Sequence, residues 1–218
     1  MTIVLIAVGF YLIAAAVLVA DVRRDPGARS RNWLFAALVA VVLHGTAHFV
    51  EWRASGSADL HFFAALSLVG LGMAAVTSLV GATGRMAALG VLVFPIAALT
   101  LAGYAQAGDV PATDLDWRLQ LHAWFALLAY ATLAVAALLA LVLAVQERAL
   151  RRREFRGWLR ALPPLVELES LLFRTIGVGF ALLTATLLTG VLFVQDLLAQ
   201  HLIHKTVLSA LSWLAFGG

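Results

Sequence analysis

Long apolar runs separated by short polar segments dominate this chain. A helix needs about 20 apolar residues to cross the hydrocarbon core of a bilayer. Six runs reach that length, and they cover about residues 2–20, 33–52, 60–80, 86–104, 119–145 and 171–194. A seventh begins near Thr206 and is too short to span. The pattern predicts an all-α fold, a polytopic transmembrane helix bundle with six full spans and a truncated seventh, partial over 206–218, in one membrane domain over 1–218.

The two ends of the chain carry further expectations. The first run, from Thr2 to Ala20, has no basic stretch before it and no small-residue cleavage pattern, so we expect a retained helix rather than a signal peptide. The seventh run stops at Gly217 and Gly218 without flanking charges. We therefore expect the chain to be C-terminally incomplete, with one or two more helices in the parent protein.

The composition also indicates a membrane protein, and it excludes several kinds of chemistry. Hydrophobic residues make up 63% of the 218 positions and charged residues 12%, and the mean hydropathy is +0.97. A soluble domain has about a quarter charged residues. The chain has no cysteine, which excludes a thiol nucleophile, an iron–sulfur cluster and covalent haem attachment. Any haem would be haem b, held non-covalently.

The cationic residues set the predicted orientation, because cytoplasmic loops are enriched in lysine and arginine. One side of the bundle receives eleven: Arg23, Arg24, Arg29, Arg31, Arg85, Arg148, Arg151, Arg152, Arg153, Arg156 and Arg160. The other side receives three: Arg53, Arg118 and Lys205. The first side is predicted to be cytoplasmic and the N-terminus to lie outside. Because topology and attraction to anionic lipid account for the arginines, we expect the bilayer rather than nucleic acid as partner.

Small residues at four-residue spacing predict the faces on which helices pack. One such stripe joins Gly70, Ala74 and Ser78 in the third span. Another joins Gly177, Ala181 and Ala185 in the sixth. We expect both stripes to face neighbouring helices.

All six histidines fall near the predicted outer ends of the spans or in outer loops: His44, His48, His61, His122, His201 and His204. Histidine is the side chain best suited to ligate haem iron. His44 and His48 are four residues apart and share one helix face, and His44 lies inside the membrane, where an ionisable residue usually points into a bundle. Either histidine could instead be neutral and hydrogen-bonded to a neighbouring helix. No HExxH motif completes a zinc site.

His122 opens the fifth span among aromatic residues, with Trp117 before it and Trp124 and Phe125 after it. A histidine in that setting could ligate haem iron with the porphyrin against the rings; the alternative is an aromatic belt at the interface with an incidental histidine. His201 and His204 precede the seventh run, and either could supply a second ligand. We assign His61, beside two phenylalanines, mainly to the belt.

Three stretches of the chain resemble the cytochrome c assembly family of haem-handling membrane proteins, in its short bacterial branch without the tryptophan-rich segment. The first is His122-Ala-Trp-Phe-Ala-Leu-Leu-Ala-Tyr130, and the second is Leu162-Pro-Pro-Leu-Val-Glu-Leu-Glu169 followed by the helix Phe173 to Thr184. The third is His204-Lys-Thr-Val-Leu-Ser-Ala-Leu-Ser-Trp213. The resemblance implies that His122 is the first of two histidines flanking a haem at the outer face. It places the family's second flanking histidine beyond Gly218.

The sequence thus predicts a haem-binding protein of the bacterial inner membrane, active in cytochrome c assembly or related haem handling. Its predicted ligands are His122, then His44, then His204, with Trp117 and Trp124 beside the porphyrin. The predicted partners are haem and cytochrome c maturation proteins or apocytochrome. We expect no catalysis on a substrate. Two alternatives stay open: a b-type electron carrier with His44 as an obligatory ligand, and a cofactor-free transporter or accessory assembly subunit.

Overall fold

The computed structural model describes residues 1–24, 31–56, 58, 60–82, 85–107, 116–153, 162–193 and 203–217. Within them the chain is helical, and six helices are long and apolar enough to cross a membrane. The elements are α1 (Thr2–Arg24), α2 (Asn32–Ser55), α3 (Phe62–Ala82), η1 (Arg85–Leu89), α4 (Gly90–Gln106), α5 (Trp117–Arg151), α6 (Leu165–Phe193) and α7 (Ile203–Gly217). The predicted all-α bundle of six spans is confirmed, and α7 is the shorter apolar helix at the seventh run.

Helices α5 and α6 extend beyond their predicted bounds at the end of the bundle where they meet. α5 continues to Arg151 rather than ending near residue 145, and its 35 residues make it about 52 Å long, well beyond the hydrocarbon thickness. The added segment, Gln146 to Arg151, consists of good helix formers. α6 begins at Leu165, directly after Pro163 and Pro164, because a proline favours the start of a helix.

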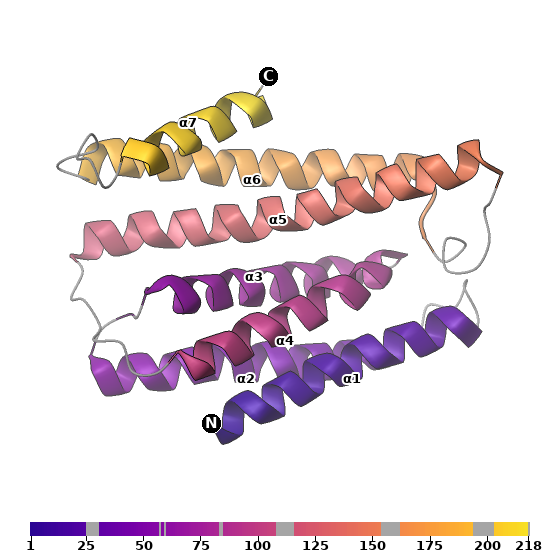
Figure 1. The fold of residues 1–218 in the computed structure, drawn as a ribbon, viewed down its shortest axis with the longest axis horizontal. Helices are drawn as coiled ribbons and strands as arrows, with labels where there is room; N and C mark the ends of the chain where they lie inside the picture. The colour runs from indigo at the N-terminus through magenta and orange to yellow at the C-terminus, as the bar shows by residue number, and fades with distance from the viewer. Residues whose placement is uncertain are drawn as a thin grey trace.

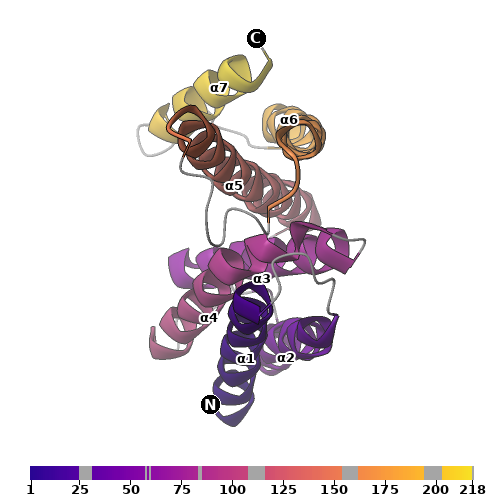
Figure 2. The ribbon, with the colours of Figure 1, turned by 90° about the vertical axis from the view of Figure 1, so that its right-hand side faces the viewer.

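The helices form two groups that share α5 (Figures 1 and 2). α1 packs against α2 and α4, and α3 packs against α2 and α4, so that the first four helices contact one another. α5 contacts α3 on one side and pairs along its length with α6 on the other. α7 packs on α6. α5 therefore lies between the four-helix group and most of α6, although Leu168 and Leu172 near the start of α6 belong to the same core as α1–α4.

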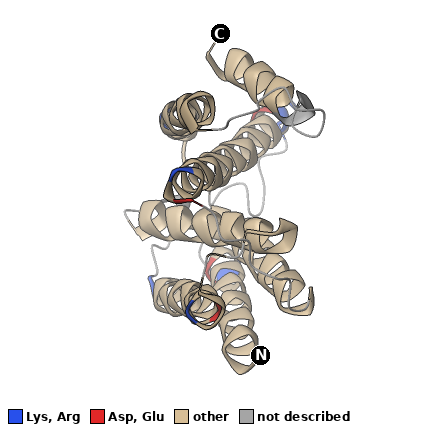
Figure 3. Cartoon of the chain, turned by 90° about the vertical axis from the view of Figure 1, so that its left-hand side faces the viewer, with Lys and Arg blue, Asp and Glu red and all other residues tan. Residues whose placement is uncertain are grey.

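Alternation of direction gives the bundle two distinct ends. α1, α3 and α5 finish at one end, where Arg23, Arg24 and Arg148 lie, and we call it the arginine end. α2 and α4 finish at the other end, where α3 and α5 begin; we call it the histidine end. Viewed from the histidine end, the described helices carry charged residues at few places (Figure 3). That the histidine end is the outer one stays a prediction from the arginine distribution.

The stripe of small residues in α3 is confirmed as a packing face, whereas the predicted one in α6 is wrong. Gly70, Ala74 and Ser78 are all buried. In α6, Gly177 and Ala181 are exposed. The buried row of α6 is instead formed by Gly179, Leu183, Thr186 and Gly190. That row faces α5, because a methyl group built on Gly179 would meet Leu133 and one built on Gly190 would meet His122. α7 contacts α6 at Phe180 and Thr184.

One glycine near the arginine end shows how closely α2 and α3 approach. A methyl group built on Gly81 would lie 2.8 Å from Cη2 of Trp33, whose side chain is 1% exposed. Trp33 in turn packs on Phe94 of α4, with ring centroids 5.9 Å apart. Gly81 is therefore the residue that admits the Trp33 indole between the helices.

Candidate functional site

Deeply buried polar side chains of α1, α2 and α3 meet in the four-helix group. His44 of α2 lies 11 residues before the end of that helix, about 16 Å along its axis. Its Nδ1 is 3.1 Å from the hydroxyl of Tyr11 in α1, and its Nε2 is 2.9 Å from Oγ of Ser67 in α3. Nε2 of His48 lies 3.0 Å from the same Oγ. The side chains of His44 and Ser67 are fully buried. Three helices are thus joined by one hydrogen-bonded cluster, the Tyr11–His44–Ser67–His48 cluster.

Proton counting restricts the state of this cluster. A serine hydroxyl carries one proton and can donate to one partner, while its oxygen can accept from others. Both imidazoles bond to the same Oγ through Nε2. They cannot both accept from it, so at least one of them carries its proton on Nε2. This arrangement suits neutral histidines held by neighbouring helices, and both ring nitrogens of His44 are engaged in it.

Aromatic rings extend from this cluster to the histidine end. The ring of His48 stacks on Tyr104 of α4, with centroids 4.3 Å apart, and His61 lies 6.0 Å from the same tyrosine. Trp52, one turn after His48, meets Trp124 of α5 edge-on with centroids 5.3 Å apart. The rings therefore connect the four-helix group to α5.

His122 of α5 faces the opposite way, into α6. Its Nδ1 lies 3.1 Å from the backbone carbonyl oxygen of Thr186 and 3.2 Å from Oγ1 of Thr189. A methyl group built on Gly190 would lie 3.2 Å from Cε1 of His122, so the absence of a side chain there makes room for the imidazole. The His122 side chain is half-buried.

The partners of His122 determine which nitrogen carries the proton. A carbonyl oxygen only accepts hydrogen bonds, so Nδ1 must donate to Thr186. In a neutral imidazole the other nitrogen, Nε2, then keeps its lone pair. Nε2 has no hydrogen-bond partner among the described residues. A backbone carbonyl that accepts from one nitrogen while the other is left as a ligand is the usual arrangement of a metal-binding histidine.

The other predicted site residues are divided between the two sides of α5. Residues two apart on a helix are about 200° apart around its axis, and accordingly His122 faces α6 while Trp124 contacts α2. Trp117 is 62% exposed and lies against Phe193 of α6, with the guanidinium of Arg118 over its ring. His122 and Trp117 thus lie along the α5–α6 pair, and the described contacts of His44 lie in the four-helix group.

The remaining two histidines, His204 and His201, lie at or just before the start of α7. The backbone of His204 lies in the first turn of α7, and its side chain is outside the described part of the structure. His201 lies wholly outside the described residues. α7 itself is placed by Trp213, which stacks on Phe180 of α6 and donates from Nε1 to Oγ1 of Thr184 at 2.9 Å. The first turn of α7 is at the histidine end (Figure 1).

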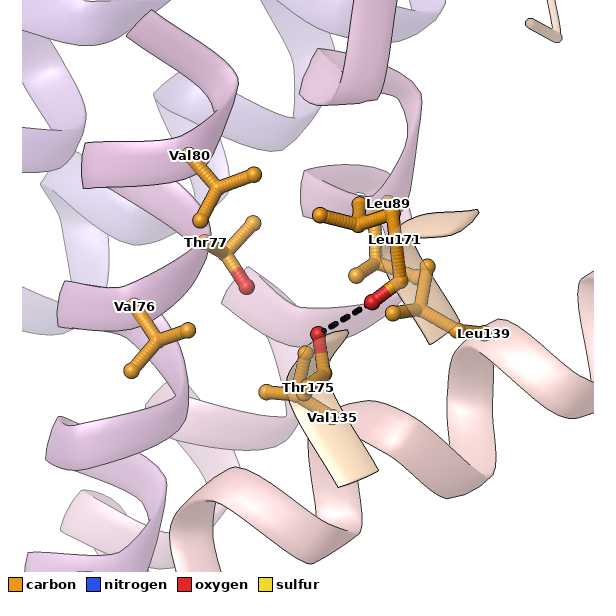
Figure 4. A pocket seen from close by; sticks show the side chains of 8 residues that line it. All are labelled: Val76, Thr77, Val80, Leu89, Val135, Leu139, Leu171 and Thr175. Carbon is orange, nitrogen blue, oxygen red and sulfur yellow. Dashed lines mark hydrogen bonds between the residues drawn. The ribbon is translucent and has the colours of Figure 1, made fainter. Parts of the chain in front are cut away.

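Two pockets in the described structure have no histidine among their lining residues. A void of about 10 Å³ lies among α3, α5 and α6, with Thr77 and Thr175 in its wall. Figure 4 shows the Thr175 hydroxyl donating to the carbonyl of Leu171, within its own helix. A larger cavity of about 390 Å³ lies at the arginine end. Among the described residues no three His, Asp or Glu side chains gather to hold a metal ion.

Three partner residues in these clusters were not singled out from the sequence. Tyr11 and Ser67 each stand nearly alone as polar side chains within apolar spans, which is itself a signal of an interhelical hydrogen bond. Thr186 contributes a backbone carbonyl, and no side-chain pattern reveals that role.

Comparison with known proteins identifies a family and several relatives of this chain. The family described as "Cytochrome C assembly protein" matches residues 29–218. "Inner membrane protein YpjD" of Escherichia coli (strain K12) is 29% identical over 216 residues, covering 97% of this chain and 82% of the relative. The "Uncharacterized 28.8 kDa protein in nifR3-like 5'region" of Azospirillum brasilense is 34% identical over 113 residues, 51% of this chain and 40% of that protein. No solved structure matches the chain.

Proposed function

This chain belongs to the cytochrome c assembly protein family and is a multi-pass inner-membrane protein, and from that premise we propose that it holds haem b non-covalently through His122 as a step of cytochrome c assembly or related haem handling. The observation that carries the proposal is the bond from Nδ1 of His122 to the Thr186 carbonyl. It fixes the tautomer and the orientation of the ring, and it leaves Nε2 as the ligand atom.

The residues around His122 suit this role. Gly190 leaves space beside the imidazole, and Thr189 adds a second oxygen near Nδ1. Trp117 and Phe193 supply apolar surface at the same end of the α5–α6 pair. Bound haem would supply the iron and its redox chemistry, whereas the protein binds and orients the group. Because the chain has no cysteine, the attachment is by coordination alone.

His204 and His44 are the candidates for a second ligand. His204 is favoured by position, because α7 begins at the histidine end and packs on α6, the helix that holds His122. His44 is fully buried and already bonded at both nitrogens. As a ligand it would exchange the Tyr11 or the Ser67 bond for iron, so we rank it behind His122.

Family membership supports proteins of cytochrome c maturation, or apocytochrome itself, as partners in this proposal. The arginine distribution favours the outer side of the membrane for the histidine end, and a partner there would receive haem. We therefore propose that haem is presented at the periplasmic face.

The test is an absorption spectrum of the full-length protein, expressed with abundant haem and purified in detergent. We expect a Soret band that His122→Ala abolishes and that added imidazole restores in that variant. His61→Ala is the matched control, because His61 lies at the same end but contacts Phe63 and Tyr104 instead of α6. It should keep the band.

The same spectra separate the alternatives. A b-type electron carrier requires that His44→Ala abolish the band and that the wild type show a reversible low-spin redox transition. A wild type with no Soret band under haem-replete expression would reject the haem proposal and favour a cofactor-free accessory role.

A further inference from the structure

A sizeable cavity lies at the arginine end of the described structure, and none of its described lining residues is a histidine. Its volume of about 390 Å³ is within the range of small-molecule pockets, roughly 300–1,000 Å³. Its walls come from the ends of α1, η1 with α4, α5, and the entry into α6. Among the described residues, the lining is aliphatic apart from Arg23, its one charged member.

A buried hydrogen bond builds the wall on the side of α6. Gln146 of α5 is 2% exposed and donates from Nε2 to the carbonyl oxygen of Pro163 at 2.9 Å. Pro163 and the neighbouring Leu162 line the cavity together with Leu168. Because a buried amide anchors this segment to α5, the cavity is bounded by fixed elements of the fold.

The lining selects the chemistry of a ligand. The described lining residues include no histidine, tyrosine or methionine that could act as an axial ligand to haem. An apolar volume beside one guanidinium suits an alkyl chain that ends in an anion. Basic pockets between helices on the cytoplasmic side of membrane proteins bind the head groups of anionic lipids.

We propose that this cavity binds an anionic phospholipid, with an acyl chain between α1, α4 and α5 and the phosphate on Arg23. Leu92 of α4 lines the cavity and is 45% exposed, so the space is reached from the lipid-facing side of the bundle. Acidic residues near this end would repel an anion only if they lined the cavity. The lining does not include Asp21, Glu167 or Glu169. The proposal is independent of haem, and its test reads lipid rather than absorbance.

The experiment is native mass spectrometry of the full-length protein in detergent with added lipid of known head group. We expect one phosphatidylglycerol to be retained in preference to phosphatidylcholine. Arg23→Gln should weaken that retention by about five-fold, the loss expected for one arginine near a membrane surface. Arg24→Gln is the matched control, because Arg24 is adjacent and exposed but outside the lining. It should leave retention unchanged.

A second pair of variants tests the volume. Leu92→Trp fills the cavity and should abolish retention, whereas Leu99→Trp, on the same helix and 72% exposed, should preserve it. Equal retention of both lipids, or equal behaviour of Arg23→Gln and Arg24→Gln, would overturn the proposal, because the lipid would then be ordinary boundary lipid. If Leu92→Trp fails to fold, as judged by circular dichroism and size-exclusion chromatography, the arginine pair still decides.

Discussion

Replacing Ser67 with alanine removes the oxygen on which two buried imidazoles converge. Ser67→Ala deletes the bonds from His44 and His48, and both nitrogens are then left in an apolar interior. A net hydrogen bond contributes about 0.5–1.5 kcal/mol, and a buried group left without a partner costs about 1–3 kcal/mol. Measured interhelical bonds in membranes are weaker, averaging about 0.6 kcal/mol. For two bonds we expect a loss of about 1–3 kcal/mol in the free energy of unfolding.

Ser78→Ala is the matched control on the same helix. Ser78 is as deeply buried, but its hydroxyl donates at 2.7 Å to the carbonyl of Ala74, within α3, whose backbone bonding survives the substitution. We expect a change within about 0.5 kcal/mol. The assay is equilibrium unfolding of the detergent-solubilised protein in sodium dodecyl sulfate, followed by circular dichroism.

A double-mutant cycle makes the test specific to the cluster. Ser67→Ala combined with His44→Phe should show a coupling of about 1 kcal/mol, and Ser78→Ala with His44→Phe should show none. If Ser67→Ala and Ser78→Ala cost the same, the hydrogen bonds of His44 and His48 to Ser67 contribute nothing measurable, and our account of the cluster is refuted.

Three further predictions concern other parts of the fold. Gly81→Ala puts a methyl group 2.8 Å from the buried indole of α2 and should cost about 1–3 kcal/mol of stability in the same unfolding assay, whereas Gly177→Ala, with no atom within 4 Å, should be neutral or stabilising. Thr189→Val removes an oxygen beside Nδ1 of the proposed ligand and should weaken haem binding by about ten-fold in a Soret titration; Thr175→Val, whose hydroxyl bonds only within α6, should not. Trp213→Phe removes the bond that ties α7 to α6 and should speed amide hydrogen exchange in α7 while leaving α1–α4 unchanged, and uniform exchange across the chain would contradict it.

The spans were predictable because hydropathy follows directly from the bilayer. The predictions of helix ends and packing faces were wrong where helix propensity or the position of a partner helix, rather than hydropathy, decides the structure. Hydropathy falls off after residue 145, yet α5 continues through helix-forming residues to Arg151. The α3 stripe containing Gly70 was predicted correctly, whereas the α6 stripe containing Gly177 was not. Small residues mark where a helix can pack, but the position of the partner helix decides which row is used.

The candidate site was predictable only within single helices. Four-residue spacing placed His44 and His48 on one face, and both do reach the same hydroxyl. The predicted haem site combines His122 with Trp124, but residues two apart on a helix point in different directions, and in the structure the first contacts α6 and the second α2. The pairing of His44 with Tyr11 and of His122 with the Thr186 carbonyl depends on contacts across 33 and 64 positions, which a single sequence does not encode.

The order of the helices along the chain sets the order in which the two histidine clusters can form. A ribosome delivers the chain from its N-terminus, so α1, α2 and α3 have all left the translocon before α6 is made, and the Tyr11–His44–Ser67–His48 cluster can close at that stage. His122 acquires its carbonyl partner only when α6 arrives. In the proposed function, His122 would be oriented for haem only after α6 has been made, and a chain arrested before α6 would lack the carbonyl that holds its Nδ1 proton.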